Sequence, residues 1–114
     1  MEEYTLRNLK KHMTKNKLIS DGWSYKINKR KYSAGVTKYI SKKIEISWYY
    51  INSPKTKKKD IINTILHEIA HALTKGHEHD TVWSRKFIEL GGNGKIKCKN
   101  FSNQYKDKQQ NYNK

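Results

Sequence analysis

The residues of this chain best suited to chemistry form the segment His67-Glu68-Ile69-Ala70-His71, which has the pattern His-Glu-x-x-His. Apolar residues recur around it with helical spacing, which predicts that the segment lies on a helix. Residues four apart share one helix face, so His67 and His71 can bind one metal ion together. Glu68 would lie beside them, too far round to be a third ligand, and would act as general base toward the attacking water.

A third metal ligand must come from later in the chain, because a catalytic zinc ion usually has three protein ligands. The candidates are His77 and His79, which follow Gly76, a residue that can end a helix in the left-handed conformation. A histidine at the start of the next helix would face back toward the first one. His79 fits best and His77 is the alternative. Asp80 would cap the new helix or accept a hydrogen bond from a ligand histidine.

The segment after Asp80 predicts a second amphipathic helix. Val82, Trp83, Phe87 and Leu90 fall on one side of it, and Gly91-Gly92 would end it. We interpret Trp83 as core packing behind the metal site, a role that is compatible with any function of that site.

The elements before the motif must position it. Residues 4–18 predict an amphipathic helix with Leu6, Leu9 and Met13 on its apolar face. Three segments then show the alternation of a half-buried strand. They are residues 23–28, 34–40 and 43–51. We predict a small three-stranded antiparallel sheet, so the expected fold class is α+β: an N-terminal helix, the sheet, and two helices that carry the metal site.

Length and composition suit one small domain. The chain has 114 residues, of which 34% are apolar and 31% charged, so we expect one compact core and a polar surface. Residues 1–101 are predicted to form the domain, and residues 102–114 a basic, flexible tail. No apolar run is long enough to span a bilayer, and the single cysteine, Cys98, cannot form an internal disulfide. We therefore expect a cytoplasmic protein without membrane contact.

The charge of the chain predicts a polyanionic partner. Twenty-five Lys and Arg against ten Asp and Glu give a net charge of +15, which favours binding to nucleic acid. No base-reading module is visible, so DNA binding would depend on phosphates and be independent of sequence. The alternative is that the lysines only keep the surface solvated.

The motif and its surroundings resemble the SprT-like zinc metalloproteases, the family of the Spartan-related proteases that act on DNA–protein crosslinks. The resemblance covers roughly residues 22–95 and rests on residues 67–73, 76–80, Trp83 and Gly91-Gly92, with Ala34-Gly35 upstream. In short members of the family the histidine before the Asp is the third ligand, which supports His79. Longer members carry a zinc ribbon with paired cysteines, and this chain has one cysteine.

The resemblance implies a function and a site. His67, His71 and His79 would hold Zn²⁺ in a minimal, gluzincin-like domain, and Glu68 would be the catalytic base of an endopeptidase acting on DNA-bound or DNA-crosslinked proteins. The protein would be a monomer, in the cytoplasm or, if viral, in the nucleoid or host-cell interior. The alternative function is a nucleic-acid-binding protein whose zinc site is mainly structural and which has no protease activity.

The resemblance also implies how a substrate binds. In related folds the strand before the zinc helix is a sheet edge that pairs with an extended peptide, and here that strand would be residues 43–51. Tyr49 or Tyr50 near its end could stabilise the oxyanion. Packing is the favoured interpretation for both tyrosines.

Overall fold

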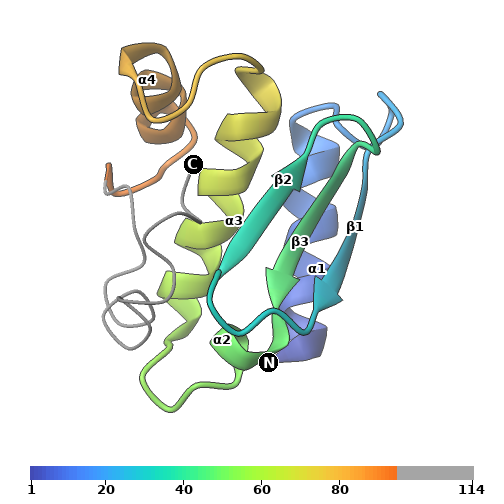
Figure 1. The fold of residues 1–114 in the computed structure, drawn as a ribbon, viewed down its shortest axis with the longest axis vertical. Helices are drawn as coiled ribbons and strands as arrows, with labels where there is room; N and C mark the ends of the chain where they lie inside the picture. Colours follow the sequence, from blue (N-terminus) through green and yellow to red (C-terminus); the bar gives the residue numbers. More distant parts are fainter. Residues whose placement is uncertain (95–114) are drawn as a thin grey trace.

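The computed structural model describes residues 1–94 and confirms the α+β class. The predicted tail, the domain boundary at residue 101 and Cys98 lie outside the described residues. The elements appear in chain order in Figure 1. They are α1 (Glu2–Lys15), β1 (Ser24–Asn28), β2 (Gly35–Lys38), β3 (Lys43–Ser47), α2 (Trp48–Ile51), α3 (Lys58–Leu73) and α4 (Thr81–Glu89).

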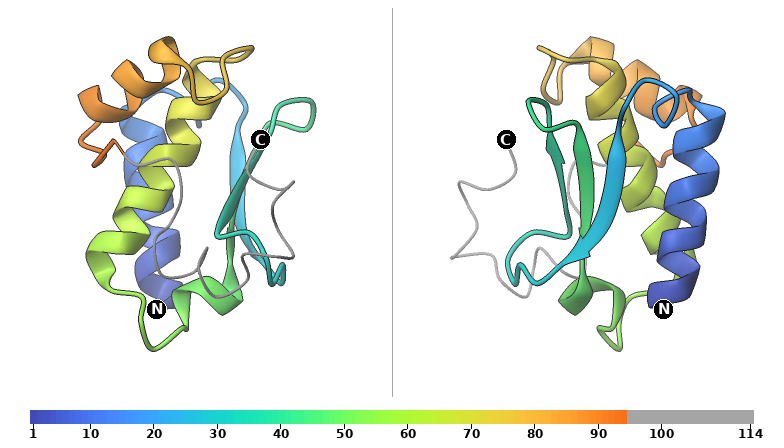
Figure 2. Two further views of the ribbon diagram at one scale, coloured as in Figure 1. Left: turned by 60° about the vertical axis from the view of Figure 1, so that its left-hand side comes forward. Right: turned by 90° about the vertical axis from the view of Figure 1, so that its right-hand side faces the viewer.

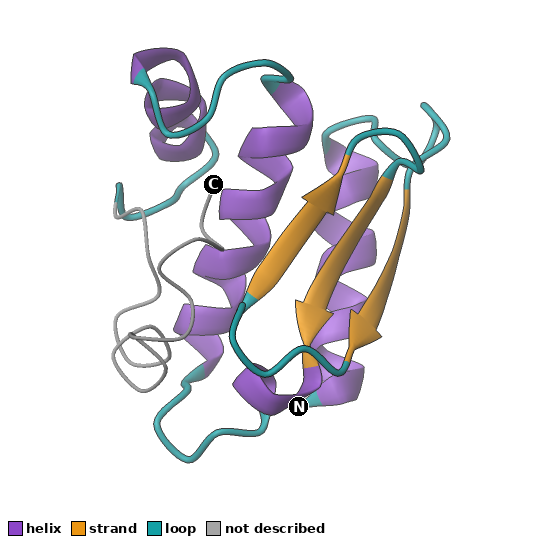
Figure 3. Ribbon diagram, viewed as in Figure 1, coloured by secondary structure: helices purple, strands orange, loops and turns teal. Residues whose placement is uncertain are grey.

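The sheet is mixed, so the prediction of a purely antiparallel sheet was wrong. Its strand order is β1-β3-β2, with β1 parallel to β3 and β2 antiparallel to β3 (Figure 3). The last strand in sequence therefore lies in the middle. Alternation along a strand indicates which side chains share a face, but it carries no information about which strands are neighbours or which way they run.

The third strand is shorter than predicted. It ends at Ser47, whose Oγ accepts a hydrogen bond from the backbone N–H of Tyr50 and caps α2. A serine cap at this point ends the strand although the next four residues are apolar or aromatic. Tyr50 lies in the core, where its hydroxyl donates to the carbonyl of Asp60 at 2.8 Å. This contact fits the packing interpretation of Tyr50.

The long helices α1, α3 and α4 lie on one side of the sheet, as Figure 2 shows. The main core forms between the sheet, α1 and α3, with Leu9, Met13, Ile44, Ile46 and Ile65 fully buried. Alternation in β3 therefore turns Lys43 and Glu45 to the opposite face of the sheet. Among residues 1–94, no long helix packs on that opposite face.

Two details of the predicted helices were wrong. The first helix spans residues 2–15, and Thr5 is buried on it whereas Leu6 is 38% exposed. On α4 the buried residues are Trp83 and Phe87, and Val82 is 46% exposed. In α1 the buried face is shifted toward Thr5 and Asn8, whereas in α4 it is narrower than the apolar residues suggested. No helix of the described residues is long and apolar enough to cross a membrane.

Candidate metal centre

Helix α3 places the first two histidines. Its start is fixed by Asp60, whose carboxylate accepts a hydrogen bond from the backbone N–H of Lys57 at 2.9 Å. The face of α3 carrying Ile61, Ile65 and Ile69 is fully buried in the main core. Burial of this face fixes the directions of the other side chains of α3. The rings of His67 and His71 therefore lie one helical turn apart, with their centroids separated by 5.0 Å.

The loop between α3 and α4 supplies the third histidine. It turns at Gly76, where φ is +91°, and His79 is itself left-handed with φ of +56°. Asp80 then caps α4, because its carboxylate accepts a hydrogen bond from the N–H of Trp83 at 3.0 Å. The other oxygen of Asp80 pairs with Nδ1 of His77 at 2.8 Å. The structure thus brings His79, and not the alternative His77, to the first two histidines.

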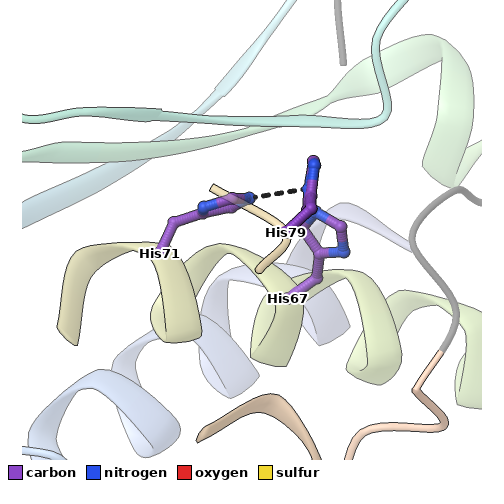
Figure 4. Close-up of side chains that lie close together, drawn as sticks. All are labelled: His67, His71 and His79. Carbon is purple, nitrogen blue, oxygen red and sulfur yellow. Dashed lines mark hydrogen bonds between the residues drawn. The ribbon is translucent and has the colours of Figure 1, made fainter. Parts of the chain in front are cut away.

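The three histidines meet through the same ring atom (Figure 4). Nε2 of His79 lies 3.1 Å from Nε2 of His71 and 3.2 Å from Nε2 of His67. Among the described residues, these three form a group of potential ligand atoms that all lie within 4.8 Å of one another. The arrangement brings together the three ligands predicted from the sequence.

Glu68 points to strand β2, which sequence reasoning did not connect with it. The hydroxyl of Thr37 lies 2.8 Å from Oε1 of Glu68 and 3.0 Å from its backbone oxygen. Gly35 leaves room for the same side chain, because a Cβ there would lie 2.9 Å from Cγ of Glu68. Oε2 of Glu68 is 3.8 Å from Nε2 of His67. Gly35 and Thr37, two residues apart on one strand face, therefore fix the position of the carboxylate next to the histidines.

Comparison with known proteins assigns the chain to a family. The model of the SprT-like family matches residues 3–106. The chain belongs to the SprT-like family. No curated protein matches this SprT-like chain significantly. Among solved structures it is similar to the metallopeptidase zymogen abylysin of Pyrococcus abyssi, with 16% sequence identity, 96% of each chain covered and a TM-score of 0.60. This likeness shows a shared fold.

Burial keeps the histidines of this SprT-like chain neutral. It lowers the pKa of His67 well below its usual value, and repulsion from the other two histidines lowers it further. Burial, followed by the neighbouring His79, lowers the pKa of His71 to about 4. The pKa of His79 is also lowered by burial, although Glu78 opposes the shift. Neutral imidazole is the form that binds a metal ion, so the rings are prepared for ligation at neutral pH.

The donor set fits zinc. Ligand nitrogens about 2.0–2.1 Å from a tetrahedral zinc ion lie about 3.3 Å from one another. The separations of Nε2 of His79 from the other two Nε2 atoms, 3.1 and 3.2 Å, are close to this spacing. Three histidines leave one position of a tetrahedron for another group, which is the usual composition of a catalytic zinc site.

Trp83 forms the floor of the centre, as the packing interpretation predicted. It is fully buried, and its ring centroid lies 4.7 Å from that of His67, 5.1 Å from His71 and 4.6 Å from His79. Phe87 packs behind it at 5.0 Å. An apolar floor restricts ring rotation and excludes water from one side of the histidines, so it holds the three Nε2 atoms together.

Glu68 is a buried carboxyl group with a raised pKa. Burial raises its pKa to about 7, and the hydrogen bond from Thr37 opposes this rise. A carboxyl group with a pKa near neutrality can both accept and release a proton under physiological conditions. A bound dication would lower this pKa by stabilising the carboxylate.

Proposed function

We propose that this SprT-like protein is a zinc-dependent endopeptidase that cleaves DNA-bound or DNA-crosslinked proteins and binds DNA without sequence preference. The observation that carries the peptidase assignment is the cluster of three neutral histidines beside the buried carboxyl group of Glu68. His67, His71 and His79 would hold the zinc ion. When bound, zinc polarises the scissile carbonyl and makes water acidic enough to be deprotonated near neutral pH.

Glu68 supplies the proton transfers. Its ionised carboxylate takes a proton from the attacking water and then delivers it to the nitrogen of the leaving amine. Thr37 holds one carboxylate oxygen by a 2.8 Å hydrogen bond, which leaves the second oxygen directed to the histidines. A base in a fixed position lowers the barrier because the enzyme has no need to order it during the reaction.

The prediction that residues 43–51 form the sheet edge was wrong, because β3 lies between β1 and β2; of these two edge strands, β2 is the one that contacts Glu68. Strand β3 is central, whereas β2 pairs with β3 on one side and, among residues 1–94, with no strand on the other. The side chain of Thr37 in β2 contacts Glu68, so this edge runs directly beside the proposed base. An extended peptide that paired with β2 would pass the metal centre, and backbone pairing requires no particular substrate sequence.

The charge supports the DNA part of the proposal. A net charge of +15 on 114 residues attracts polyanions. Binding through phosphates would place the enzyme next to proteins already bound to the same DNA, which raises their effective concentration at the metal centre. Substrate choice would then come from location, since pairing with β2 is unselective.

The alternative is a DNA-binding protein with a structural zinc ion. Such a site normally has a fourth Cys or His ligand, and among the described residues the spare histidine next to His79 in the loop is His77. His77 instead pairs with Asp80 on the exposed side of the loop. A structural site also has no use for a buried Glu68 held by Thr37. Both observations favour the enzyme.

A cleavage time course tests the proposal. Zinc-loaded protein is incubated with a DNA-binding protein, with and without single-stranded DNA, and Glu68→Gln is the control. We expect cuts that are faster with DNA and absent from the control. Cuts that are unaffected by DNA would remove the DNA part of the proposal, and no cuts despite full zinc loading would favour the structural-zinc alternative.

A further inference from the structure

The positive charge is distributed very unevenly along the chain. Residues 22–59 contain eleven Lys and Arg and one acidic residue, Glu45. Residues 60–94, which contain the metal centre, have three Lys and Arg and five acidic residues. The half of the domain that carries the sheet is therefore strongly basic, whereas the half that carries the histidines is slightly acidic.

The basic residues of the sheet gather on one face. Alternation turns the apolar residues of β1 and β3 toward the helices and their lysines to the opposite side. The loop that follows β1 adds further exposed cations. We call this surface the basic sheet face; it comprises Lys26, Lys38 and Lys43 on the strands and Lys29, Arg30 and Lys31 in the loop.

The lysines of this face are held close together. Lys38 and Lys43 are direct partners across the β2–β3 pair, and like charges in such positions destabilise a sheet. One acid compensates part of this repulsion: the buried carboxylate of Glu45 lies 3.1 Å from Nζ of Lys38 and 4.0 Å from Nζ of Lys26. An anion bound on the face would compensate the rest.

The carboxylate of Glu45 interacts with neighbouring residues of the sheet. Burial alone would raise its pKa, but hydrogen bonds from Asn28 and Lys38 and the charges of Lys38 and Lys26 outweigh burial and lower it. The negative charge of Glu45 is thus compensated by Lys38 and Lys26 of the same face. The loop residues Lys29 and Lys31 each contact an aromatic ring.

Two aromatic side chains lie at the loop end of the face. Trp48 and Tyr49, both half-buried, pack edge to face with centroids 5.2 Å apart. Nζ of Lys29 lies 4.6 Å from the Trp48 ring, and Nζ of Lys31 lies 5.5 Å from the Tyr49 ring. Cations for phosphates beside aromatic rings for bases are the combination that binds single-stranded nucleic acid.

We propose that the basic sheet face is a binding surface for single-stranded nucleic acid, in which the six cations contact phosphates and Trp48 or Tyr49 stacks on an unpaired base. This inference gives a location to the DNA binding of the proposed function and rests on it. The surface lies opposite the side of the sheet that faces the metal centre. Strand β2 belongs to both, because Thr37 reaches Glu68 from one face and Lys38 reaches the other. A protein attached to the bound nucleic acid would thus lie close to β2, the edge at which we propose that the substrate peptide pairs.

Salt-dependent binding to a labelled single-stranded oligonucleotide tests the surface. The variant Lys29→Gln/Arg30→Gln/Lys31→Gln removes three exposed loop cations. The control Lys10→Gln/Lys11→Gln/Lys15→Gln removes three exposed cations from α1, behind the sheet. All proteins carry Glu68→Gln, so that no cleavage occurs. We expect the loop variant to reduce the slope of log K against log salt by about 2, and the control by less than half as much. Equal slopes for the two variants would overturn the inference.

Two further variants test the sign of the charge effect and the stacking. Glu45→Gln removes the acid that lies among the lysines of the strands and should tighten binding, whereas weaker binding by folded protein would count against the proposal. Trp48→Leu should weaken single-strand binding about tenfold and leave duplex binding unchanged. An equal effect on both would contradict the assignment to single strands.

The outcome can be separated from that of the peptidase. With native Glu68, the loop variant should cleave an unstructured protein without DNA at the unaltered rate and should lose DNA stimulation. If the zinc-loaded protein cleaves nothing, yet the loop variant selectively loses binding, the surface stands and the peptidase proposal fails. If cleavage is intact and the loop variant binds like the control, the peptidase proposal stands and the proposed binding surface is wrong.

Discussion

Among single residues, Glu68 depends most on its neighbours for its position. Thr37 donates to its carboxylate, and Gly35 leaves space for its side chain. Neither residue belongs to the His-Glu-x-x-His motif, and they lie 33 and 31 positions before Glu68 in the sequence. The motif therefore identifies the base, whereas β2 determines where its oxygens point.

Replacing Thr37 should impair catalysis without removing zinc. Thr37→Val keeps the shape of the side chain but loses the hydrogen bond to Glu68, and a hydrogen bond to a charged group contributes about 1.5–3 kcal/mol. We expect kcat to fall about 10- to 100-fold with full zinc content. Thr37→Ser restores the hydroxyl and should recover most of the rate. A Val variant as active as the unmodified protein would show that Thr37 does not position the base.

Adding one methyl group at Gly35 should have a similar effect through steric contact. The new Cβ would lie 2.9 Å from Cγ of Glu68, which is closer than carbon atoms can approach. Gly35→Ala should displace the carboxylate and lower kcat, while His67, His71 and His79 still bind zinc. Kinetics together with metal analysis of the purified variant distinguish this result from loss of the site.

The raised pKa of Glu68 predicts a stability effect in zinc-free protein. Its folded-state pKa of about 7 exceeds the usual value of 4.5, so folding favours the protonated form. This contribution is fully present below pH 4.5 and is lost as the pH rises through 7. Zinc-free Glu68→Gln should therefore be more stable than the parent at pH 8, by about 3 kcal/mol, and equally stable at pH 4. Denaturant unfolding at both pH values measures the difference.

At the scale of elements, the loop between α3 and α4 decides which histidine completes the site. His79 occupies the left-handed region, which costs most side chains roughly 1–2 kcal/mol and which asparagine tolerates. His79→Asn should thus lose tight zinc binding but keep the stability of the zinc-free protein within about 0.5 kcal/mol. His77→Asn, two positions earlier, is the matched control and should retain zinc. Zinc competition assays on both variants test the assignment, which fails if the His77 variant is the one that loses the metal.

The elements also show which parts of the structure were predictable. Helix α3, the turn at Gly76 and the cap at Asp80 depend on neighbouring residues, and all three agreed with the sequence. The central position of β3 and its parallel pairing with β1 depend on contacts between distant segments, and alternation cannot encode them. The contact of Thr37 with Glu68 was missed for the same reason. Leu6 and Val82 were assigned to buried faces because they are apolar, although packing against the neighbouring element leaves both exposed.

At the scale of the whole molecule, a small core is supplemented by the metal centre. Leu66, Ala70, Trp83 and Phe87 form a separate cluster that joins α4 to α3, and the histidines lie on top of it. Zinc bound to His67 and His71 of α3 and to His79 of the loop would connect the same two segments. The metal would therefore stabilise the packing of α4 as well as serve the reaction.

Removing zinc should accordingly lower the thermal stability of the whole domain. At a free zinc concentration 1,000 times the dissociation constant, binding adds about 4 kcal/mol to the free energy of unfolding. Chelation should lower Tm by many degrees, and re-addition of zinc should restore it. His71→Ala should show the low Tm with or without zinc. A Tm that is independent of zinc in the unmodified protein would mean that the three histidines do not bind it tightly.

The role of Glu68 as general base is tested by the cleavage rate of Glu68→Gln, measured on the same samples as its zinc content. For Glu68→Gln we predict one zinc ion per chain, an unchanged Tm in the presence of zinc, and no detectable cleavage of a DNA-bound protein that the parent cuts. His71→Ala should lose both zinc and cleavage. Cleavage by zinc-loaded Glu68→Gln at a rate close to that of the parent would contradict the assignment of Glu68 as the general base and the mechanism built on it.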